Sequence, residues 1–596
     1  MKELSTLNKY LYKYRWRLFI GMLFVIASNF FSVLQPKVVR YALDMVYENI
    51  KLYGLYDGFD LQSALFDDLG RTLLMFAGLM LVLALIMGIF MYFMRQTIIV
   101  MSRLIEYDLR NEIFTHYEKL NLAFYKRNNT GDLMARISED VTKVRMYLGP
   151  AIMYGINLIS LFALVIYSML SVNVELTLWA LAPLPVLSVS IYYVSRMINK
   201  KSTEIQTQLS VLNSAAQEVY SGIRVVKSYV QERPMAKFFA KESDIFKDKS
   251  MGLARIQAAF FPLMLLLIGV STILTIYIGG LKVAAGTVTP GNIAEFIIYV
   301  NMLTWPVAAL GWVASIIQSA AASQKRINEF LETEPTIVEN DAEFSKLSGA
   351  VEFNDVTFVY PDTGIKALEN VNFKLEPGQK MAIIGRTGSG KTTIVDLLVR
   401  MYDVTDGQIL IDNKNIESLS LSSLRQNMGY VPQDVFLFSD SIAQNVAFGN
   451  ENATQEEIEK YTKYASVYDD IMEFPQGFET LVGERGVTLS GGQKQRVSIA
   501  RALIKQPDIL ILDDSLSAVD TTTEKRILNY LEKTMADKTA IIITHRIYNL
   551  LDFDKIIVLE DGRITESGTH EELLENKGFY FEMYEQQQIE AETVTD

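Results

Sequence analysis

The chain of 596 residues has no cysteine and only three histidines. Without cysteine it forms no disulfide and builds no thiolate metal centre, and three histidines leave little scope for a metal site made of imidazoles. Lysine and arginine together number 56 against 69 for aspartate and glutamate, so the formal net charge is −13. This acidic balance argues against nucleic acid as a partner.

Long apolar runs fill the first 320 residues, whereas the remainder has the composition of an ordinary globular domain. Half of all residues are hydrophobic and the mean hydropathy is +0.17, which is unusual for a wholly soluble protein. A helix needs ~20 apolar residues to cross a bilayer. Six segments meet that length, and we expect membrane spans near Leu18–Val39, Thr72–Met94, Tyr147–Leu170, Val174–Val194, Ala258–Leu281 and Ile293–Ile317.

The charges between these segments predict their orientation. The connection Tyr41–Arg71 is mostly acidic and is expected outside, whereas Arg95–Arg145 and Arg196–Arg255 are rich in lysine and arginine and are expected inside. An even number of spans then places both termini in the cytoplasm of a multi-pass protein of the inner membrane. No cleavage site for a signal peptide is evident. Met1–Arg17 is either an amphipathic helix on the cytoplasmic face or a solvated basic tail.

Both internal connections are polar, helical in pattern and longer than a turn requires. We expect the spans to continue as helices into the cytoplasm, with short transverse pieces near Leu120–Tyr125 and Ser210–Ala216. From Val351 onward β-rich segments alternate with helices, the pattern of an α/β domain. The expected divisions are a transmembrane domain (1–330), a charged linker (331–350), an α/β domain (351–585) and a flexible tail (586–596).

The second domain contains a phosphate-binding loop between an apolar strand and a helix. Its motif is G-x-x-x-x-G-K-[ST], in which backbone N–H groups surround the phosphates, Lys391 reaches the β- and γ-phosphates and the Thr392 hydroxyl completes the Mg²⁺ shell. By itself this motif indicates only a nucleotide. The residues expected to bind it are Gly385, Arg386, Thr387, Gly388, Ser389, Gly390, Lys391, Thr392 and Thr393.

A second motif, Leu489-Ser-Gly-Gly-Gln493, follows about a hundred residues later. With the phosphate loop it makes this domain resemble the ATPase domain of ABC transporters, and two stretches, 124–136 and 222–232, are similar to intracellular loops of ABC exporters that dock on the ATPase domains. The resemblance implies a membrane all-α domain of six helices followed by a cytosolic α/β P-loop ATPase domain. It also implies ATP and Mg²⁺ as cofactors.

The resemblance assigns roles to further residues. It implies that Tyr360 stacks on the adenine ring, that Gln433 contacts Mg²⁺ and the attacking water, and that Asp513 binds the metal. Ser517–Asp520 matches the loop that couples two sites, and His545 matches the histidine that contacts the γ-phosphate. The signature residues are expected to cap the γ-phosphate held by a different ATPase domain; they are Ser490, Gly491, Gly492 and Gln493.

One position departs from the family pattern. The residue after the metal-binding aspartate is normally a glutamate acting as general base, and here it is Asp514. Because the chain has six spans and one ATPase domain, the resemblance implies a dimer of half-transporters. Asp514 beside an intact signature favours the degenerate-site subunit of a heterodimeric bacterial multidrug exporter. A homodimer remains open, since His545 is retained.

The expected activity is ATP-driven export of amphipathic drugs or lipids by alternating access. Aromatic and methionine side chains in the spans suit varied amphipathic cargo, although ordinary packing explains most of them. Glu295 lies near the outer end of the sixth span, where an acid could serve cationic substrates. The alternatives are a homodimeric lipid flippase and an ATP-gated channel or regulator that does not pump.

Overall fold

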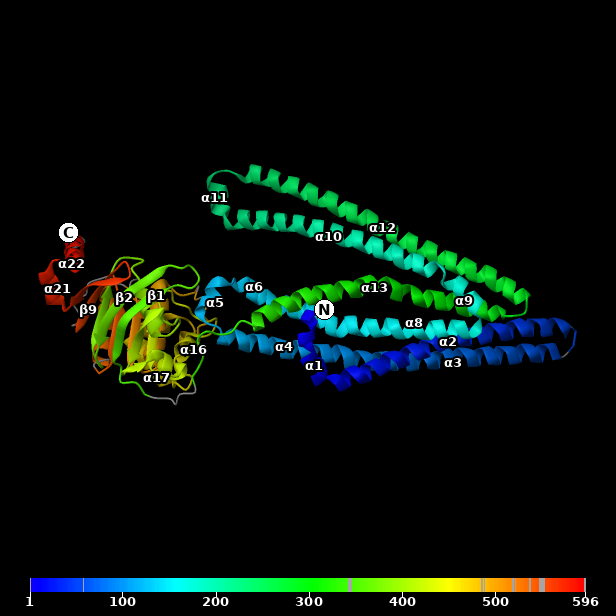
Figure 1. Cartoon of the computed structure of the whole chain (residues 1–596), viewed down its shortest axis with the longest axis horizontal. Helices are drawn as coiled ribbons and strands as arrows, with labels where there is room; N and C mark the ends of the chain where they lie inside the picture. Colours follow the sequence, from blue (N-terminus) through cyan, green and yellow to red (C-terminus); the bar gives the residue numbers. More distant parts are fainter. Residues whose placement is uncertain are drawn as a thin grey trace. The chain divides into compact units, whose positions relative to one another are not determined.

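The computed structural model describes residues 2–593, apart from 57, 60, 341–345, 484–485, 487, 517–518, 520, 535–536 and 546–552. The chain forms two compact units (Figure 1). Unit 1 comprises Met1–His116 and Gly131–Thr333, and unit 2 comprises Tyr117–Thr130 and Glu334–Asp596. The segment 117–130 therefore belongs with the second unit, although the sequence around it continues into membrane helices.

Unit 1 is entirely helical within the described residues. Its elements are a 3-10 helix (Lys2–Leu7), α1 (Asn8–Lys13), α2 (Arg15–Leu55), α3 (Leu61–Met94), α4 (Val100–Lys119), α6 (Thr130–Ala135), α7 (Val141–Met146), α8 (Ile152–Val172), α9 (Val174–Leu181), α10 (Pro183–Ser221), α11 (Ile223–Ser228), α12 (Glu232–Ala284) and α13 (Pro290–Leu331). Short π-helical turns join α3 to α4, α6 to α7 and α7 to α8, so that these helices run on without a break.

Six continuous helices among the described residues are long and apolar enough to cross a membrane, which confirms the predicted number. They are Arg15–Leu55, Gln62–Lys119, Thr130–Val172, Val174–Ser221, Glu232–Ala284 and Pro290–Leu331. Each predicted span lies within one of them. The helices are much longer than the spans, and the expected outer loop 41–71 is mostly helical, because α2 continues to Leu55 and α3 begins at Leu61.

One local prediction in this unit was wrong, and one of the two alternatives for the N-terminus is excluded. Residues 210–216 lie inside α10, and the short transverse helix is α11, which follows Gly222, the residue that ends α10. The N-terminus is not a solvated tail, because Leu4 and Leu7 are buried and the Thr6 side chain is hydrogen-bonded to Asn328 of α13. Burial of these leucines stabilises the contact with α13 in a way that basic residues alone would not.

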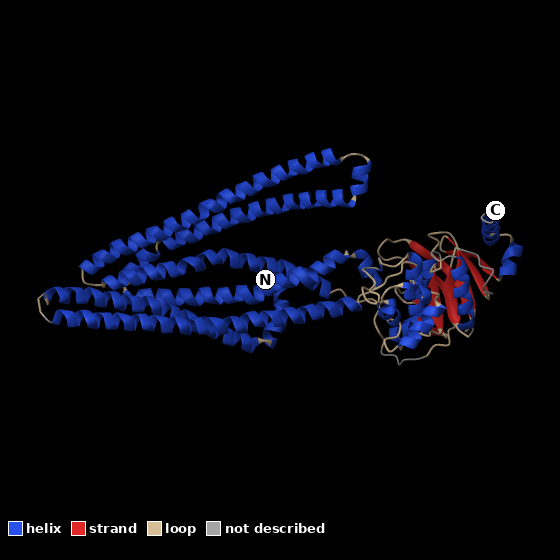
Figure 2. Ribbon diagram, turned by 180° about the vertical axis from the view of Figure 1, so that it is seen from behind, coloured by secondary structure: helices blue, strands red, loops and turns tan. Residues whose placement is uncertain are grey.

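Unit 2 contains two sheets (Figure 2). An antiparallel sheet has the order β2-β1-β4-β5, and a six-stranded sheet has the order β10-β9-β3-β8-β7-β6. The strands are β1 (Val351–Val359), β2 (Lys366–Leu375), β3 (Lys380–Ile384), β4 (Asp406–Ile411), β5 (Lys414–Asn415), β6 (Met428–Val431), β7 (Ile509–Asp513), β8 (Thr539–Ile543), β9 (Lys555–Glu560) and β10 (Arg563–Gly568).

The helices of unit 2 cover these sheets. They are α5 (Leu122–Arg127), α14 (Lys391–Leu398), α15 (Leu421–Gln426), α16 (Ile442–Ala447), α17 (Gln455–Tyr464), α18 (Tyr468–Glu473), α19 (Gly491–Leu503), α20 (Thr521–Thr534), α21 (His570–Asn576) and α22 (Phe579–Thr593). Residues 586–593, expected as part of a tail, form the end of α22, and 594–596 lie outside the described residues.

The central strands of the larger sheet decide where the site forms. Strands β9, β3, β8, β7 and β6 are mutually parallel, and every residue of β7 and β8 is buried, as expected for strands covered on both faces. Parallel strands end at a common edge, and ligands of α/β sheets bind beyond that edge. The residues following β3, β6, β7 and β8 are thus brought together.

Candidate functional site

The phosphate loop follows β3 and ends where α14 begins at Lys391. Gly388 and Gly390 have φ of 84° and 103°, the left-handed region that favours glycine. A Cβ on Gly385 would lie 2.2 Å from the Leu559 carbonyl oxygen, and one on Gly390 would lie 2.6 Å from that of Ala367. The loop thus depends on the absence of side chains, which leaves its backbone N–H groups open to a phosphate.

Lys391 is buried at the start of α14, and its Nζ donates hydrogen bonds of 2.8 Å to the carbonyls of Gly385 and Arg386. Burial lowers the pKa of Lys391, against the opposing charges of Asp513 and Asp514. Phosphate oxygens are stronger partners for an ammonium group than carbonyls are, because the bond is then charge-assisted on both sides. Lys391 is therefore placed to exchange these two bonds for bonds to a phosphate.

Asp513 ends β7 and is almost completely buried. Burial raises the pKa of its carboxyl, and the charge of Asp514 adds to the rise, whereas the hydroxyl of Thr392 and the charge of Lys391 oppose it. Among the described residues, Asp513 Oδ2 has no hydrogen-bond partner. A buried carboxylate oxygen beside a threonine hydroxyl matches the oxygen ligands that Mg²⁺ requires.

Asp514 lies one residue further along the chain, and its backbone is held in place. Its φ is 45°, and its N–H donates a 3.0 Å hydrogen bond to the Ile543 carbonyl at the end of β8. Gln433, two residues after β6, donates from Nε2 to Asp514 Oδ2 over 3.5 Å. The structure therefore brings Gln433 into contact with the candidate general base.

His545 follows β8 at the same edge of the sheet, where its backbone carbonyl accepts a 2.7 Å hydrogen bond from Gln587 Nε2. His545 thus lies at the carboxyl edge of the sheet, and its contact with the γ-phosphate stays a prediction. In the predicted coupling loop 517–520, only Val519 is among the described residues.

The sequence predicts that the signature opens a helix over Gln493–Ile504, and the observed helix, α19, begins two residues earlier, at Gly491. Ser490 is the N-cap: its Oγ accepts from Gln493 N–H, and Gln493 Oε1 accepts from Ser490 N–H, which makes a capping box. Gln493 also donates to Asp470, which pairs with Arg496. The amides of Gly491 and Gly492 lie at the positive end of a 13-residue helix, where an anion is favoured.

The signature and the phosphate loop lie in different parts of unit 2. The helix α14 packs into the core cluster that includes β1, β2 and β4, whereas α19 packs into a second cluster with α16 and α17. No hydrogen bond or ion pair between described residues joins Ser490, Gly491 or Gly492 to the loop 385–392. Each chain thus presents the two halves of a nucleotide site separately.

Tyr360, the expected partner of adenine, follows β1 and is half-buried. Its hydroxyl is 2.9 Å from Thr393 Oγ1, and burial raises the pKa of its phenol. A basic residue not predicted from the sequence lies beside it: Lys126 of α5 has its Nζ 5.0 Å from the Tyr360 ring centroid. The only sequence signal was a pair of basic residues just after the predicted transverse piece 120–125, which the structure moves to Leu122–Arg127.

Glu295 in α13 is buried and already paired. Its carboxylate is 3.1 Å from Arg40 of α2 and also accepts hydrogen bonds from Tyr299 and Asn292. These contacts tie α13 to α2. A carboxylate with its partners in place is a poor candidate for a cationic substrate, because the substrate would first have to displace Arg40.

The donor set fits ATP with Mg²⁺. The glycines leave a cradle that a Cβ would fill, Lys391 has an ammonium group beside it, and Asp513 offers an unpartnered buried oxygen next to Thr392. When bound, the metal would neutralise phosphate charge and orient the terminal phosphoryl group. The carboxylate of Asp514 contacts Gln433 at the same edge of the sheet, and its action on a water molecule stays a prediction.

Comparison with known proteins agrees with this geometry. Residues 18–307 match the family "ABC transporter transmembrane region", and residues 368–517 match "ABC transporter". The chain is 36% identical over 595 residues to the multidrug resistance-like ATP-binding protein MdlA of Escherichia coli, covering 99% of this chain and 98% of MdlA. It is 35% identical over 486 residues to the ATP-dependent lipid A-core flippase of Syntrophus aciditrophicus, covering 80% of each.

The chain also has the fold of a solved ABC exporter structure. The chain superposes on a bacterial Atm1-family ABC exporter with ATP bound at a TM-score of 0.76 and 26% identity, covering 96% of this chain and 99% of that one. The six apolar helices, the phosphate loop, the carboxylates after β7 and the signature helix are thus found together in one polypeptide. The chain belongs to the ABC exporter family, as a multi-pass half-transporter whose ATP hydrolysis is coupled to transport.

Proposed function

We propose that this chain exports amphipathic drugs or lipids across the inner membrane by alternating access, with both termini in the cytoplasm. One observation carries the proposal: a single polypeptide joins six apolar helices to one complete set of phosphate-loop, carboxylate and signature residues. Two relatives that cover most of the chain are named for multidrug resistance and for lipid A-core flipping. The cargo class is inferred from those names and from the aromatic and methionine content of the spans.

In this proposal different site residues bind the base, the phosphates and the metal ion. Tyr360 stacks on the base, the loop 385–393 holds the phosphates, and Thr392, Gln433 and Asp513 hold Mg²⁺. Asp514 orients the attacking water with Gln433, and His545 contacts the γ-phosphate. The phosphates gain charge-assisted bonds at Lys391 and at the first turn of α14.

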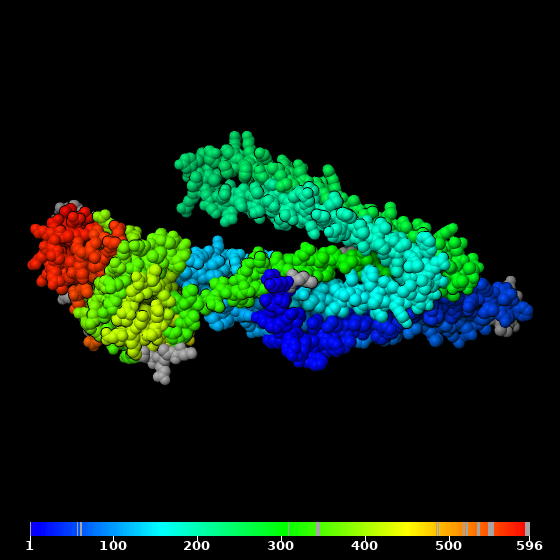
Figure 3. Space-filling model, in the orientation of Figure 1, coloured from blue at the N-terminus to red at the C-terminus, as the bar shows by residue number. Residues whose placement is uncertain are grey.

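Half-transporters of this family function as dimers, and the geometry supports a head-to-tail pair. The signature helix α19 and the phosphate loop lie in different core clusters of the domain, so a second domain would complete each site. In addition, the ends of α10 and α12 near α11 extend away from the other helices of unit 1 (Figure 3). No residue of α11 is buried.

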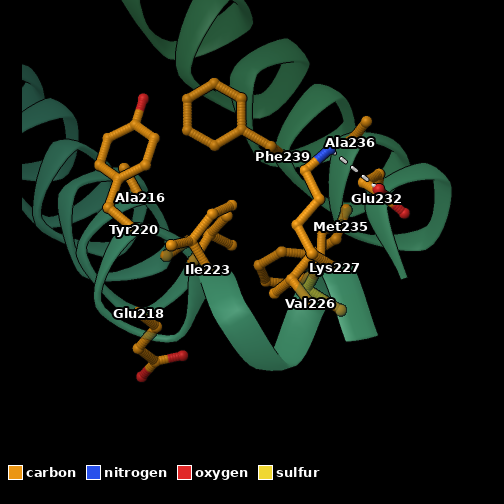
Figure 4. A pocket seen from close by; sticks show the side chains of 13 residues that line it. Ala216, Glu218, Tyr220, Ile223, Val226, Lys227, Glu232, Met235, Ala236 and Phe239 are labelled. Atoms are coloured by element: carbon orange, nitrogen blue, oxygen red, sulfur yellow. Dashed lines mark hydrogen bonds and ion pairs between the residues drawn. The ribbon is translucent and has the colours of Figure 1, made fainter. Parts of the chain in front are cut away.

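The end of the helical hairpin formed by α10, α11 and α12 is apolar. A cavity of 420 Å³ lies against α11, lined by Tyr220, Ile223, Val226 and Phe239, with Lys227 paired to Glu232 at its edge (Figure 4). We assign the α11 tip to the ATPase domain of the partner half-transporter. The first transverse helix, α5, offers a parallel within this chain, because its Ala123 and Leu122 pack into the core of this chain's own ATPase domain.

We further propose that the partner is a different chain and that this chain carries the degenerate site. Asp514 has a side chain one methylene shorter than glutamate, while the capping box at Ser490 is intact. In such a pair Ser490 serves the competent site of the partner. Ser490→Ala should then cut turnover severely, whereas Lys391→Ala should reduce it less than the equivalent lysine change in the partner.

Two measurements test the function. First, the tagged chain is purified from its native host, and a second half-transporter recovered at a one-to-one ratio supports the heterodimer; recovery of this chain alone supports the homodimer. Second, the purified complex in liposomes should accumulate a fluorescent amphipathic dye against its gradient when ATP is added. ATP-dependent flux that only runs downhill would instead identify an ATP-gated channel.

A further inference from the structure

The short helix α5 is built into unit 2. Asn121 caps its N-terminus by accepting from Phe124 N–H, and the Asn121 side chain also donates to Thr336 Oγ1. Ala123 is buried in the large core cluster of this unit, and Leu122 packs against the same cluster. The last turn holds Lys126 and Arg127, which are the residues that approach the nucleotide-binding end of the domain.

The two basic residues make different contacts. Arg127 donates to the backbone carbonyl of Pro361, a contact that anchors α5 to the chain beside Tyr360. Lys126 instead lies over two aromatic rings, with Nζ 5.0 Å from the centroid of Tyr360 and 5.3 Å from that of Tyr402. Both distances are within the ~6 Å at which a cation is attracted to a ring face.

The two tyrosines form one aromatic group with Phe358. The Tyr360 and Tyr402 centroids are 5.5 Å apart at 90°, and the Tyr360 and Phe358 centroids are 4.9 Å apart at 78°, both edge-to-face arrangements. Tyr360 is also bonded through its hydroxyl to Thr393, two residues after Lys391. A continuous set of contacts therefore runs from Lys126 through Tyr360 to the start of α14.

We propose that Lys126 is a specificity-determining positioning residue of the nucleotide site: its ammonium holds the Tyr360 ring in the orientation that accepts the purine base. This proposal rests on the proposed function, which assigns Tyr360 to the base. Because Lys126 belongs to α5, base occupancy and the docking of α5 strengthen each other. The linkage is reciprocal: if docked α5 strengthens binding of the base, then a bound base stabilises the docking of α5 by the same free energy.

The expected effect is modest. Cation–π contacts at partly exposed sites correspond to about a two- to fivefold change in affinity. Lys126→Met keeps the length of the side chain and removes the charge, whereas Lys126→Arg keeps a cation over the rings. Lys119→Met is the matched control, because it makes the same change at an exposed lysine beside α5 that contacts neither the two rings nor Pro361.

The experiment uses the purified full complex and reports on this chain alone. Labelling of this chain by 8-azido-ATP is displaced with MgATP or with magnesium tripolyphosphate, which has the phosphates but no base. Lys126→Met should raise the ATP concentration needed for half-displacement about two- to fivefold and leave that for tripolyphosphate unchanged. Lys126→Arg should keep the wild-type value, and Lys119→Met should behave as wild type.

Hydrogen exchange supplies a second readout. ATP should increase amide protection of α5 in the wild type, tripolyphosphate should not, and Lys126→Met should abolish the difference. Each variant is first checked for wild-type thermal unfolding, and Lys126→Arg keeps the test meaningful if the methionine variant is unstable. Equal loss for ATP and tripolyphosphate in Lys126→Met, or no loss for either, would overturn the proposal.

Tyr360→Ala distinguishes failure of the Lys126 proposal from failure of the proposed function, in which Tyr360 binds the base. If Tyr360 holds the base, this variant weakens ATP but not tripolyphosphate, and adding Lys126→Met causes no further loss. If Tyr360→Ala changes neither competitor, the assignment of the base partner itself is wrong. If it weakens ATP while Lys126→Met does not, only the role of Lys126 fails.

Discussion

Replacement of Asp514 tests the degenerate site most directly. In the asymmetric pair, Asp514→Glu should raise hydrolysis at this chain's own site, and Asp514→Asn should change total turnover little. The structure gives the reason: the backbone of Asp514 is held by the N–H bond to the Ile543 carbonyl, so the main chain does not shift to compensate for a short side chain. The reach of the carboxylate is therefore set by its own length.

The magnitude follows from that geometry. The Asp514 carboxylate is 3.5 Å from Gln433 Nε2, at the outer limit of a hydrogen bond, so the pair is already loosely held. A catalytic group misplaced by ~1 Å costs on the order of a hundredfold in rate, or about 2.7 kcal/mol of barrier. We expect Asp514→Glu to recover part of that factor. Because φ is 45° at this position, glutamate should also lower the unfolding temperature, since aspartate tolerates this conformation better.

The assay is steady-state ATP hydrolysis by the purified complex, with single-turnover measurements on each site where the two rates differ. Lys391→Ala serves as the control that removes nucleotide binding from this chain's site without altering Asp514. In a symmetric homodimer every site uses Asp514, so Asp514→Asn would nearly abolish hydrolysis. That result would refute the asymmetric pair.

Two further predictions concern stability. Burial raises the pKa of Asp396 in α14 to about 6 from its ordinary 3.8, and the charge of Lys126 offsets part of the rise. Above pH 6 the ionised carboxylate therefore lowers the free energy of unfolding by about 3 kcal/mol. This loss disappears as the pH falls below about 4. Asp396→Asn should therefore raise the unfolding temperature at pH 8 and give about half of that stabilisation at pH 5, which lies between the two pKa values; an equal gain at both would exclude this cause. Glu295→Gln should lower the unfolding temperature, because it breaks the ion pair with Arg40 and reduces the free energy of unfolding by about 1.5–3 kcal/mol. If Glu295 instead served cationic cargo, the change would alter dye selectivity at unchanged stability.

The sequence alone predicted the elements that depend on short-range patterns. Six apolar runs predicted the six long helices, because a helix of that length buries its backbone polar groups within itself. The apolar run 509–513 likewise indicates β7 without any tertiary information, because a strand covered on both faces needs apolar residues throughout. The glycine spacing predicted the loop 385–390, because the backbone there adopts conformations that a Cβ would prevent.

Only the tertiary structure decided which residues meet. Gln433 and Asp514 are 81 positions apart in the chain, and they touch because β6 and β7 are parallel neighbours that end at the same edge. Lys126 and Tyr360 lie still further apart, and no periodicity marks either as a partner of the other. The local pattern predicted a transverse piece at 210–216, but α10 continues through these residues and ends only at Gly222. Contacts between distant segments depend on packing that no single segment contains, and the sequence therefore specified the parts of the nucleotide site while the fold joined the site to α5.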